Sequence, residues 1–294
     1  QQADALLKSL QQQRGGQLKI FLGASPGVGK TCAMLNAARE RAAEGVRLLV
    51  GLVETHGRTD TQALLHDLPM LPRKEVVYQG QPLSEFDLDA ALAAKPQLIL
   101  VDELAHSNIP GSRHQRRYQD IAELLEAGID VYTTMNIQHV ESLNDLVKQV
   151  TGVRVRETVP DQFIDQAQQL VFIDVEPAHL LQRLAQGKVY IGEFAEQAKQ
   201  QFFQKETLTA LRDMAVRLVM RHVDSQLLTE QQAKARQRDY QITDKLLVLI
   251  TNRRDQEHLI RAGRRIAEKR QVPWGVVWVD TGAIQGQTEQ LRLQ

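Results

Sequence analysis

Residues 23–31 read GASPGVGKT, and this stretch decides both the fold and the chemistry that we expect. It matches the phosphate-binding pattern G-x-x-x-x-G-K-[ST] except at the first position, which is Ala24. A strand-like segment, LKIFL, precedes it, and a helix-like segment, CAMLNAARERAAEG, follows it. In that arrangement backbone N–H groups and the positive end of the helix dipole face a phosphate. The stretch therefore predicts a P-loop that binds ATP or a close relative of it.

A nucleotide held by such a loop needs a cation, and the sequence offers ligands for Mg²⁺. Lys30 is expected to neutralise the β- and γ-phosphates, and the Thr31 hydroxyl to coordinate the metal. A second metal ligand is expected at Asp102, because the apolar segment QLILVDE resembles a Walker B strand. The alternative for Asp102 is an N-cap after the strand. The residues expected to bind the nucleotide are Gly27, Val28, Gly29, Lys30, Thr31 and Asp102.

Glu103 is the candidate catalytic residue, because it follows the metal ligand directly and could orient or deprotonate an attacking water. The alternative is a carboxylate that lies beside the site without being positioned for hydrolysis. Other polar residues follow the expected strands; they could sense the γ-phosphate or be ordinary loop residues. These are Glu54, His56, Arg58, His106, Asn108, Asn136, Gln138 and His139. Arg113, Arg116 and Arg117 could reach a phosphate in a neighbouring subunit or form a solvated basic stretch.

The pattern of apolar residues predicts an α/β fold of the P-loop NTPase type. Short aliphatic and β-branched runs alternate with longer stretches of helical period, which is typical of a mostly parallel sheet covered by helices. Ser84 with Asp87 three residues later resembles a capping box ahead of LDAALAA. The expected strands are 17–22, 46–53, 75–78, 97–101, 129–134 and 170–175.

The second half of the chain predicts a helical extension and then a new domain. Helices are expected at 177–186, 193–203 and 205–228. We therefore expect a P-loop domain with a helical tail at 17–228 and a polar linker at 229–243. A strand, a helix and a second strand in 244–294 predict the opening βαβ unit of a second α/β domain, which is incomplete.

Composition limits the classes of function. Lys plus Arg equals Asp plus Glu at 36 each, so no overall field draws the chain to nucleic acid or to an anionic membrane. Aromatic residues make up only 5%, which disfavours a nucleic-acid motor with stacking side chains. A lone cysteine, Cys32, excludes an internal disulfide, and no apolar run approaches the ~18 residues of a membrane span. We expect a cytoplasmic fragment of a longer protein, since the chain starts at Gln1 and stops within the second domain.

Several long segments together resemble the N-terminal cytoplasmic sensor domain of the KdpD family of potassium-responsive histidine kinases, over about residues 17–225. The resemblance implies an ATP-binding regulatory domain, a universal-stress-protein-like domain after it, and then membrane helices and a dimeric kinase module that acts on a response regulator. The family's phosphoaccepting histidine box is not in these residues. The matching segments are GASPGVGKT, VETHGRTDT, SEFDLDAAL, ILVDELAHSNIPGSRHQRRYQDI, GIDVYTTMNIQHVESLNDLV, VRETVPD and GKVYI.

Two main functional hypotheses follow. The first is an ATP-binding regulatory module of a two-component sensor histidine kinase that controls potassium-transport genes, with the rest of the kinase and a response regulator as partners and a dimer as the full-length state. The alternative is a self-sufficient P-loop ATPase or kinase acting on an unidentified acceptor. A freestanding stress-type protein with both domains is a further reading, and direct nucleic-acid binding is not expected.

Overall fold

The computed structural model describes residues 15–55, 57–187, 201–237, 246–250, 257–270 and 272–278, without the side chains of 228–237. The chain divides into two compact units, Gln1–Asp224 and Ser225–Gln294. Each unit is α/β, as expected from the sequence.

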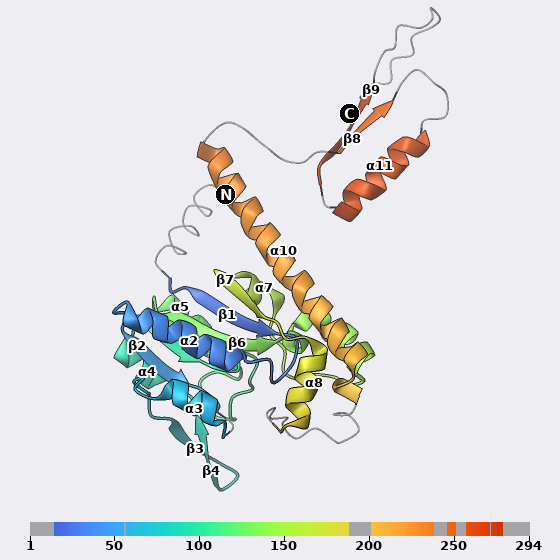
Figure 1. Cartoon of the computed structure of the whole chain (residues 1–294). Helices are drawn as coiled ribbons and strands as arrows, with labels where there is room; N and C mark the ends of the chain where they lie inside the picture. Colours follow the sequence, from blue (N-terminus) through green and yellow to red (C-terminus); the bar gives the residue numbers. More distant parts are fainter. Residues whose placement is uncertain are drawn as a thin grey trace, which may run out of the picture. The chain divides into compact units, whose positions relative to one another are not determined.

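The first unit is built on a five-stranded parallel sheet with the order β2-β5-β6-β1-β7 (Figure 1). Because all five strands are parallel, their carboxyl ends meet at one edge, where loops from distant parts of the chain come together. β6 pairs with both β1 and β5, so its end lies between the ends of those two strands. The strands are β1 (Leu18–Gly23), β2 (Leu48–Leu52), β5 (Leu98–Val101), β6 (Asp130–Asn136) and β7 (Gln169–Ile173).

Both faces of the sheet are buried, which explains why its strands are almost continuously apolar. On β1, Phe21 points to one face and packs in a cluster with Met34 and Leu35 of α2. Leu22 points to the other face and joins the larger core, to which α5 and the start of α10 contribute. Figure 1 shows α2 and α5 on opposite faces of the sheet. The helices described in this unit are α2 (Lys30–Ala43), α3 (Thr59–Leu65), α4 (Leu88–Ala94), α5 (Arg117–Glu126), α6 (Asn144–Thr151), α7 (Asp161–Asp165), α8 (Pro177–Ala185) and the part of α10 (Lys205–Gln237) up to Asp224, with 3₁₀ turns η1 (Ile137–His139) and η2 (Glu141–Leu143).

The expected strand at 75–78 lies outside the parallel sheet. It is β3 (Lys74–Tyr78), which pairs antiparallel with β4 (Gln81–Glu85), a strand that the sequence did not predict. The two-residue turn has positive φ at both positions, 50° at Gln79 and 81° at Gly80, as a type I′ hairpin requires. Gln-Gly is a weaker signal for this turn than Asn-Gly, so the hairpin was missed.

The expected capping box at Ser84 is wrong. Ser84 belongs to β4, and Asp87 itself is the N-cap of α4, where its side chain accepts a hydrogen bond from the N–H of Ala90 at 3.0 Å. The physical reason is that β4 continues to Glu85, which leaves Asp87 as the last non-helical residue with a suitable acceptor.

Helix α10 continues to Gln237 and so includes residues 229–237 of the expected linker. Gln, Glu, Ala, Lys and Arg fill this segment, and these residues favour a helix although they are polar. The expected helix at 193–203 and the segment GKVYI fall mostly in 188–200, which lies outside the described residues.

The second unit contains the expected strand, helix and strand. β8 (Leu246–Ile250) and β9 (Trp274–Trp278) are parallel, and α11 (Glu257–Arg270) connects them. A Cβ at Gly263 would lie 2.2 Å from Cγ2 of Val248, so this helical glycine allows α11 to pack closely on β8. Among the described residues, no helix is long and apolar enough to cross a membrane.

Candidate functional site

The glycine-rich loop, residues 24–29, connects the end of β1 to the first turn of α2. Gly27 and Gly29 have φ of 84° and 97°, in the left-handed region that favours glycine. A Cβ at Gly23 would lie 2.5 Å from Cγ2 of Val28 and 2.9 Å from Cδ of Lys30. The loop therefore curls back over the end of β1 and brings the Lys30 side chain with it.

The Lys30 ammonium is poorly neutralised inside the protein. Its Nζ donates to the carbonyl oxygen of Ser25 at 3.4 Å, a long contact. Desolvation by burial lowers its pKa from 10.5 to about 8, although the negative charge of Asp102 acts in the opposite direction. An anion in front of Lys30 would raise this pKa again, which is the behaviour expected of a phosphate-binding lysine.

Asp102 follows β5 and is 2% exposed. Its Oδ2 accepts hydrogen bonds from Thr31 Oγ1 at 3.2 Å and from the N–H of Glu54 at 3.4 Å. Its Oδ1 accepts from the Thr134 hydroxyl on β6 and from the N–H of Glu103 at 3.1 Å. Burial raises the pKa of the Asp102 carboxyl, against the effect of the Thr134 hydrogen bond. A cation placed here would therefore compensate a buried negative charge.

The Thr31 and Asp102 pair fits Mg²⁺ rather than a metal held by protein alone. A hydroxyl and a carboxylate are hard oxygen ligands, and Mg²⁺ is usually bound by one or two such groups together with water and phosphate. Within the described parts of the chain, no group of three or more His, Cys, Asp or Glu side chains could hold a metal. The residues present thus fit a metal that arrives with a phosphate ligand.

Glu103 has a strained backbone, with φ of 57° in the left-handed region. For a residue other than glycine such a conformation costs about 1–3 kcal/mol and is commonest at functional sites. The N–H of Glu103 bonds Asp102 Oδ1 and approaches Thr134 Oγ1 at 3.4 Å. This left-handed conformation turns the chain sharply at the end of β5, and Glu103 lies in the wall of the cavity described next.

A cavity of about 330 Å³ lies at the carboxyl edge, between the loops that follow β1, β2, β5 and β6. Three of its lining residues carry a buried polar atom without a hydrogen-bond partner: Arg58 Nε, Asn136 Oδ1 and Gln138 Oε1. Buried polar atoms are normally paired, so these point to a polar ligand or to water. The lining residues are Pro26, Gly27, Lys30, Thr31, Arg58, Asp102, Glu103, Ala105, His106, Thr134, Met135, Asn136, Gln138, His139 and Glu157.

His139 lines the cavity as a neutral side chain. Its Nδ1 lies 2.8 Å from the carbonyl oxygen of Glu157, which can only accept, so Nδ1 carries the proton. Desolvation by burial lowers the pKa of His139 below the usual value for histidine, although the contact with Glu157 acts against it. Nε2 is then left as an acceptor.

The remaining candidates from the sequence lie outside the cavity or at its rim. Glu54 pairs with Arg73 at 2.8 Å, and Asn108 donates to Asp120 at 2.6 Å, so both stabilise the surrounding loops. His106 lines the cavity and lies 3.4 Å from Glu85. His56 lies outside the described residues.

The three arginines at 113–117 differ in their exposure: Arg113 is exposed, Arg116 is half-buried and Arg117 is buried. Arg113 pairs with Asp89 and Glu123, and Arg116 donates to Ser107. Arg117 is 1% exposed. Arg117 is therefore neither solvated nor able to reach another subunit, which contradicts both readings of the sequence for this residue, whereas the exposed Arg113 fits the solvated reading.

The sequence did not reveal what Arg117 does. It pairs with Glu85 of β4 at 2.5 Å and donates to the backbone carbonyl of Asp102 at 3.2 Å. Burial raises the pKa of Glu85, but contacts from His106, Arg117 and the N–H of Phe86 outweigh it and lower that pKa from 4.5 to about 2. This buried ion pair therefore supports the loop that carries Asp102. Glu85 ends β4, a strand that the sequence did not predict, so nothing in the sequence indicated this ion pair.

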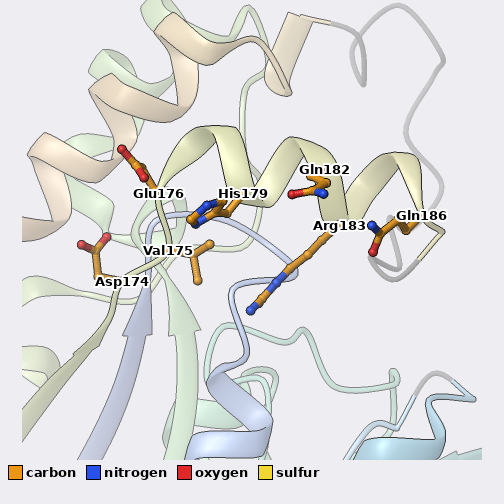
Figure 2. A pocket seen from close by; sticks show the side chains of 7 residues that line it. All are labelled: Asp174, Val175, Glu176, His179, Gln182, Arg183 and Gln186. Carbon is orange, nitrogen blue, oxygen red and sulfur yellow. The ribbon is translucent and has the colours of Figure 1, made fainter.

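A second cavity, of about 510 Å³, lies where β7 passes into α8 (Figure 2). Figure 2 shows His179, Gln182, Arg183 and Gln186 along one side of α8. No described residue lining this cavity has a buried side-chain nitrogen or oxygen without a hydrogen-bond partner. Asp174 forms an ion pair with Arg212 at 2.5 Å. The cavity at the glycine-rich loop is therefore the better candidate. The lining residues of the second cavity are Asp174, Val175, Glu176, His179, Gln182, Arg183 and Gln186.

Comparisons with known proteins agree with the resemblance seen in the sequence. Residues 14–223 match the protein family described as "KdpD: Osmosensitive K+ channel His kinase sensor domain". The sensor protein KdpD of Escherichia coli is 50% identical over 289 residues, which cover 98% of this chain and 32% of that protein. The sensor protein KdpD of Clostridium acetobutylicum is 43% identical over 274 residues, 93% of this chain and 30% of the relative.

A relative from Synechocystis sp. is 44% identical over 256 residues, 87% of this chain and 68% of its own length. The chain thus spans about a third of the length of the first two relatives and about two thirds of the third.

Proposed function

This chain belongs to the KdpD sensor-domain family, and from that premise we propose that it is the ATP-binding regulatory module of a two-component sensor histidine kinase. In this proposal the kinase controls potassium-transport genes through a response regulator. The observation that supports ATP as the ligand is the cavity in which Lys30, Thr31 and Asp102 meet at the carboxyl edge of the sheet.

The residues around the cavity have separable roles in this proposal. Bound ATP with Mg²⁺ would supply the negative charge and the cation that the cavity lacks. The glycine-rich loop offers backbone N–H groups, and Lys30 offers a poorly neutralised ammonium. Thr31 and Asp102 are already joined by a hydrogen bond and would share the metal. Gly27, Val28 and Gly29 shape the loop.

Regulation requires that occupancy of the site changes another part of the protein. Asp102 offers one route, because its backbone carbonyl is held by the buried Arg117, which pairs with Glu85 in the hairpin β3–β4. A ligand that displaces Asp102 would therefore bias the position of this hairpin. In the proposal the remaining kinase, which is dimeric and membrane-bound, receives this change at its cytoplasmic face. The second unit would begin a universal-stress-protein-like domain at 244–294.

A second candidate function is ATP hydrolysis by this chain itself. The observation that favours it is Glu103, whose strained backbone places it in the cavity wall next to Asp102. Glu103 would orient or deprotonate a water for attack on the γ-phosphate, with the catalytic role that the sequence predicts.

The test is to measure ATP binding by calorimetry and phosphate release, both with Mg²⁺. We expect Lys30→Ala to weaken ATP binding by at least about tenfold, the range expected for a charged hydrogen bond. Lys148→Ala is the matched control, because Lys148 is exposed on α6 and does not line the cavity. Binding that is unchanged in Lys30→Ala would refute the proposal. Steady phosphate release that Glu103→Gln abolishes would favour the ATPase instead.

A further inference from the structure

Arg58 enters the cavity from the side opposite to Lys30. It follows the loop after β2 and is the N-cap residue of α3. In the sheet order, β2 and β1 are separated by β5 and β6, so their ends lie roughly 14 Å apart at about 4.8 Å per strand. The long Arg58 and Lys30 side chains both reach the same cavity across this distance.

The Arg58 guanidinium has no anionic partner in the described part of the structure. Its Nε is buried and makes no hydrogen bond. The nearby Glu54 is paired with Arg73, and the Asp102 carboxylate accepts from Thr31 and Thr134. A buried guanidinium nitrogen without a hydrogen-bond partner is costly, and it is retained most readily where a ligand supplies the missing acceptor.

The two cations also act on each other. The charge of Arg58 adds to the desolvation that lowers the pKa of Lys30, although Asp102 opposes it. Two positive groups that face one cavity repel each other until an anion separates them. An anion that reached from Lys30 to Arg58 would relieve this repulsion, and a longer polyphosphate chain reaches farther than a single phosphate.

We propose that Arg58 binds the terminal phosphate of the nucleoside triphosphate and so makes the site selective for a triphosphate over a diphosphate, an inference that rests on the proposed function. The planar guanidinium can bond two phosphate oxygens at once. Because Arg58 is also the N-cap of α3, the terminal phosphate fixes the start of that helix.

Helix α3 is in turn attached to α2. Arg39 of α2 donates to the carbonyl oxygens of Leu64 and His66 at the end of α3. The Cys32 thiol lies 3.7 Å from the hydroxyl of Thr61. The presence of the terminal phosphate is thereby passed from Arg58 to α3 and onto the surface of this unit.

The test compares the affinities for ATP and ADP, each with Mg²⁺, in the complete chain. We expect Arg58→Gln to weaken ATP binding by about tenfold or more and ADP binding by less than about twofold, because only ATP carries a γ-phosphate. Arg58→Lys should give an intermediate loss, since an ammonium keeps the charge without the planar pair of donors. Arg41→Gln, on the exposed side of α2 in a pair with Glu44, makes the same change of net charge and should leave both affinities unaltered.

The outcomes separate this inference from the proposed function. An Arg58→Gln variant that keeps the parent ratio of ATP to ADP affinity, whether both affinities are unchanged or equally weakened, overturns the role of Arg58 in selectivity. The proposal that the cavity binds ATP would still stand. Failure of Lys30→Ala to weaken either nucleotide overturns the nucleotide site itself. Circular dichroism and thermal melting of each variant show whether a lost affinity reflects lost folding.

Discussion

Removing the charge of Glu85 should destabilise the first unit strongly, because Glu85 and Arg117 form an ion pair that is 4% and 1% exposed. In Glu85→Gln the guanidinium stays buried without its carboxylate, and breaking such a pair typically costs about 3–5 kcal/mol. The fall in the pKa of Glu85 from 4.5 to about 2 gives a similar figure, about 3 kcal/mol at about 1.4 kcal/mol per pH unit.

The pH dependence has a definite sign. The pKa of Glu85 is lower in the folded than in the unfolded chain, so its stabilisation is complete above pH 4.5 and is lost as the pH falls toward about 2. The free energy of unfolding of the parent chain should exceed that of Glu85→Gln by about 3 kcal/mol at pH 7 and by about 1 kcal/mol at pH 3.

The assay is urea unfolding followed by circular dichroism at both pH values. Arg113→Gln is the control, because Arg113 pairs with Asp89 and Glu123 on the surface and should cost at most about 1 kcal/mol. A difference below about 1 kcal/mol between the parent and Glu85→Gln at pH 7, or one that does not change with pH, would falsify the assignment of a charged, buried pair.

Three further predictions concern the backbone and Asp102. Gly23→Ala should abolish ATP binding measured by calorimetry, because a Cβ there lies 2.5 Å from Val28; retained affinity would contradict the close packing of the loop. Asp102→Asn should remove the Mg²⁺ dependence of ATP binding and yet raise the melting temperature of the ligand-free chain, since burial raises the pKa of this carboxyl; a lower melting temperature would argue against that cost. Gly80→Ala should lower the free energy of unfolding by about 1 kcal/mol, because φ is 81°, and a neutral effect in urea would speak against the turn.

Local patterns predicted the elements of the first unit well where one strand or helix could be read alone. The apolar runs around Leu22 and Leu100 indicated buried strands, and these strands are found in a parallel sheet. The pattern around Gly27 and Gly29 indicated a glycine-rich loop between a strand and a helix, and the structure has such a loop between β1 and α2. Such features depend on neighbouring residues and can be read directly.

Features that depend on distant partners were missed. Arg117 reads as one of three basic residues in a loop, and only the fold brings Glu85 to it from 32 positions away. The hairpin that positions Glu85 depends on a Gln-Gly turn, whose propensity is modest. The roles of Lys30, Thr31, Asp102 and Glu103 in binding and catalysis stay predictions until ligands are measured.

The position of β6 between β1 and β5 has a consequence for biosynthesis. Thr31 and Asp102 are 71 residues apart in the chain, and the strand that aligns them, β6, is synthesised after both. A ribosome-bound chain that stops before Asp130 has the glycine-rich loop, Thr31 and Asp102, but not the strand that sets their spacing. Pairings at such long range form slowly. The cavity at the glycine-rich loop is thus assembled late. Under the proposed function, ATP would bind completed molecules and not nascent ones, and it would stabilise the fully folded chain.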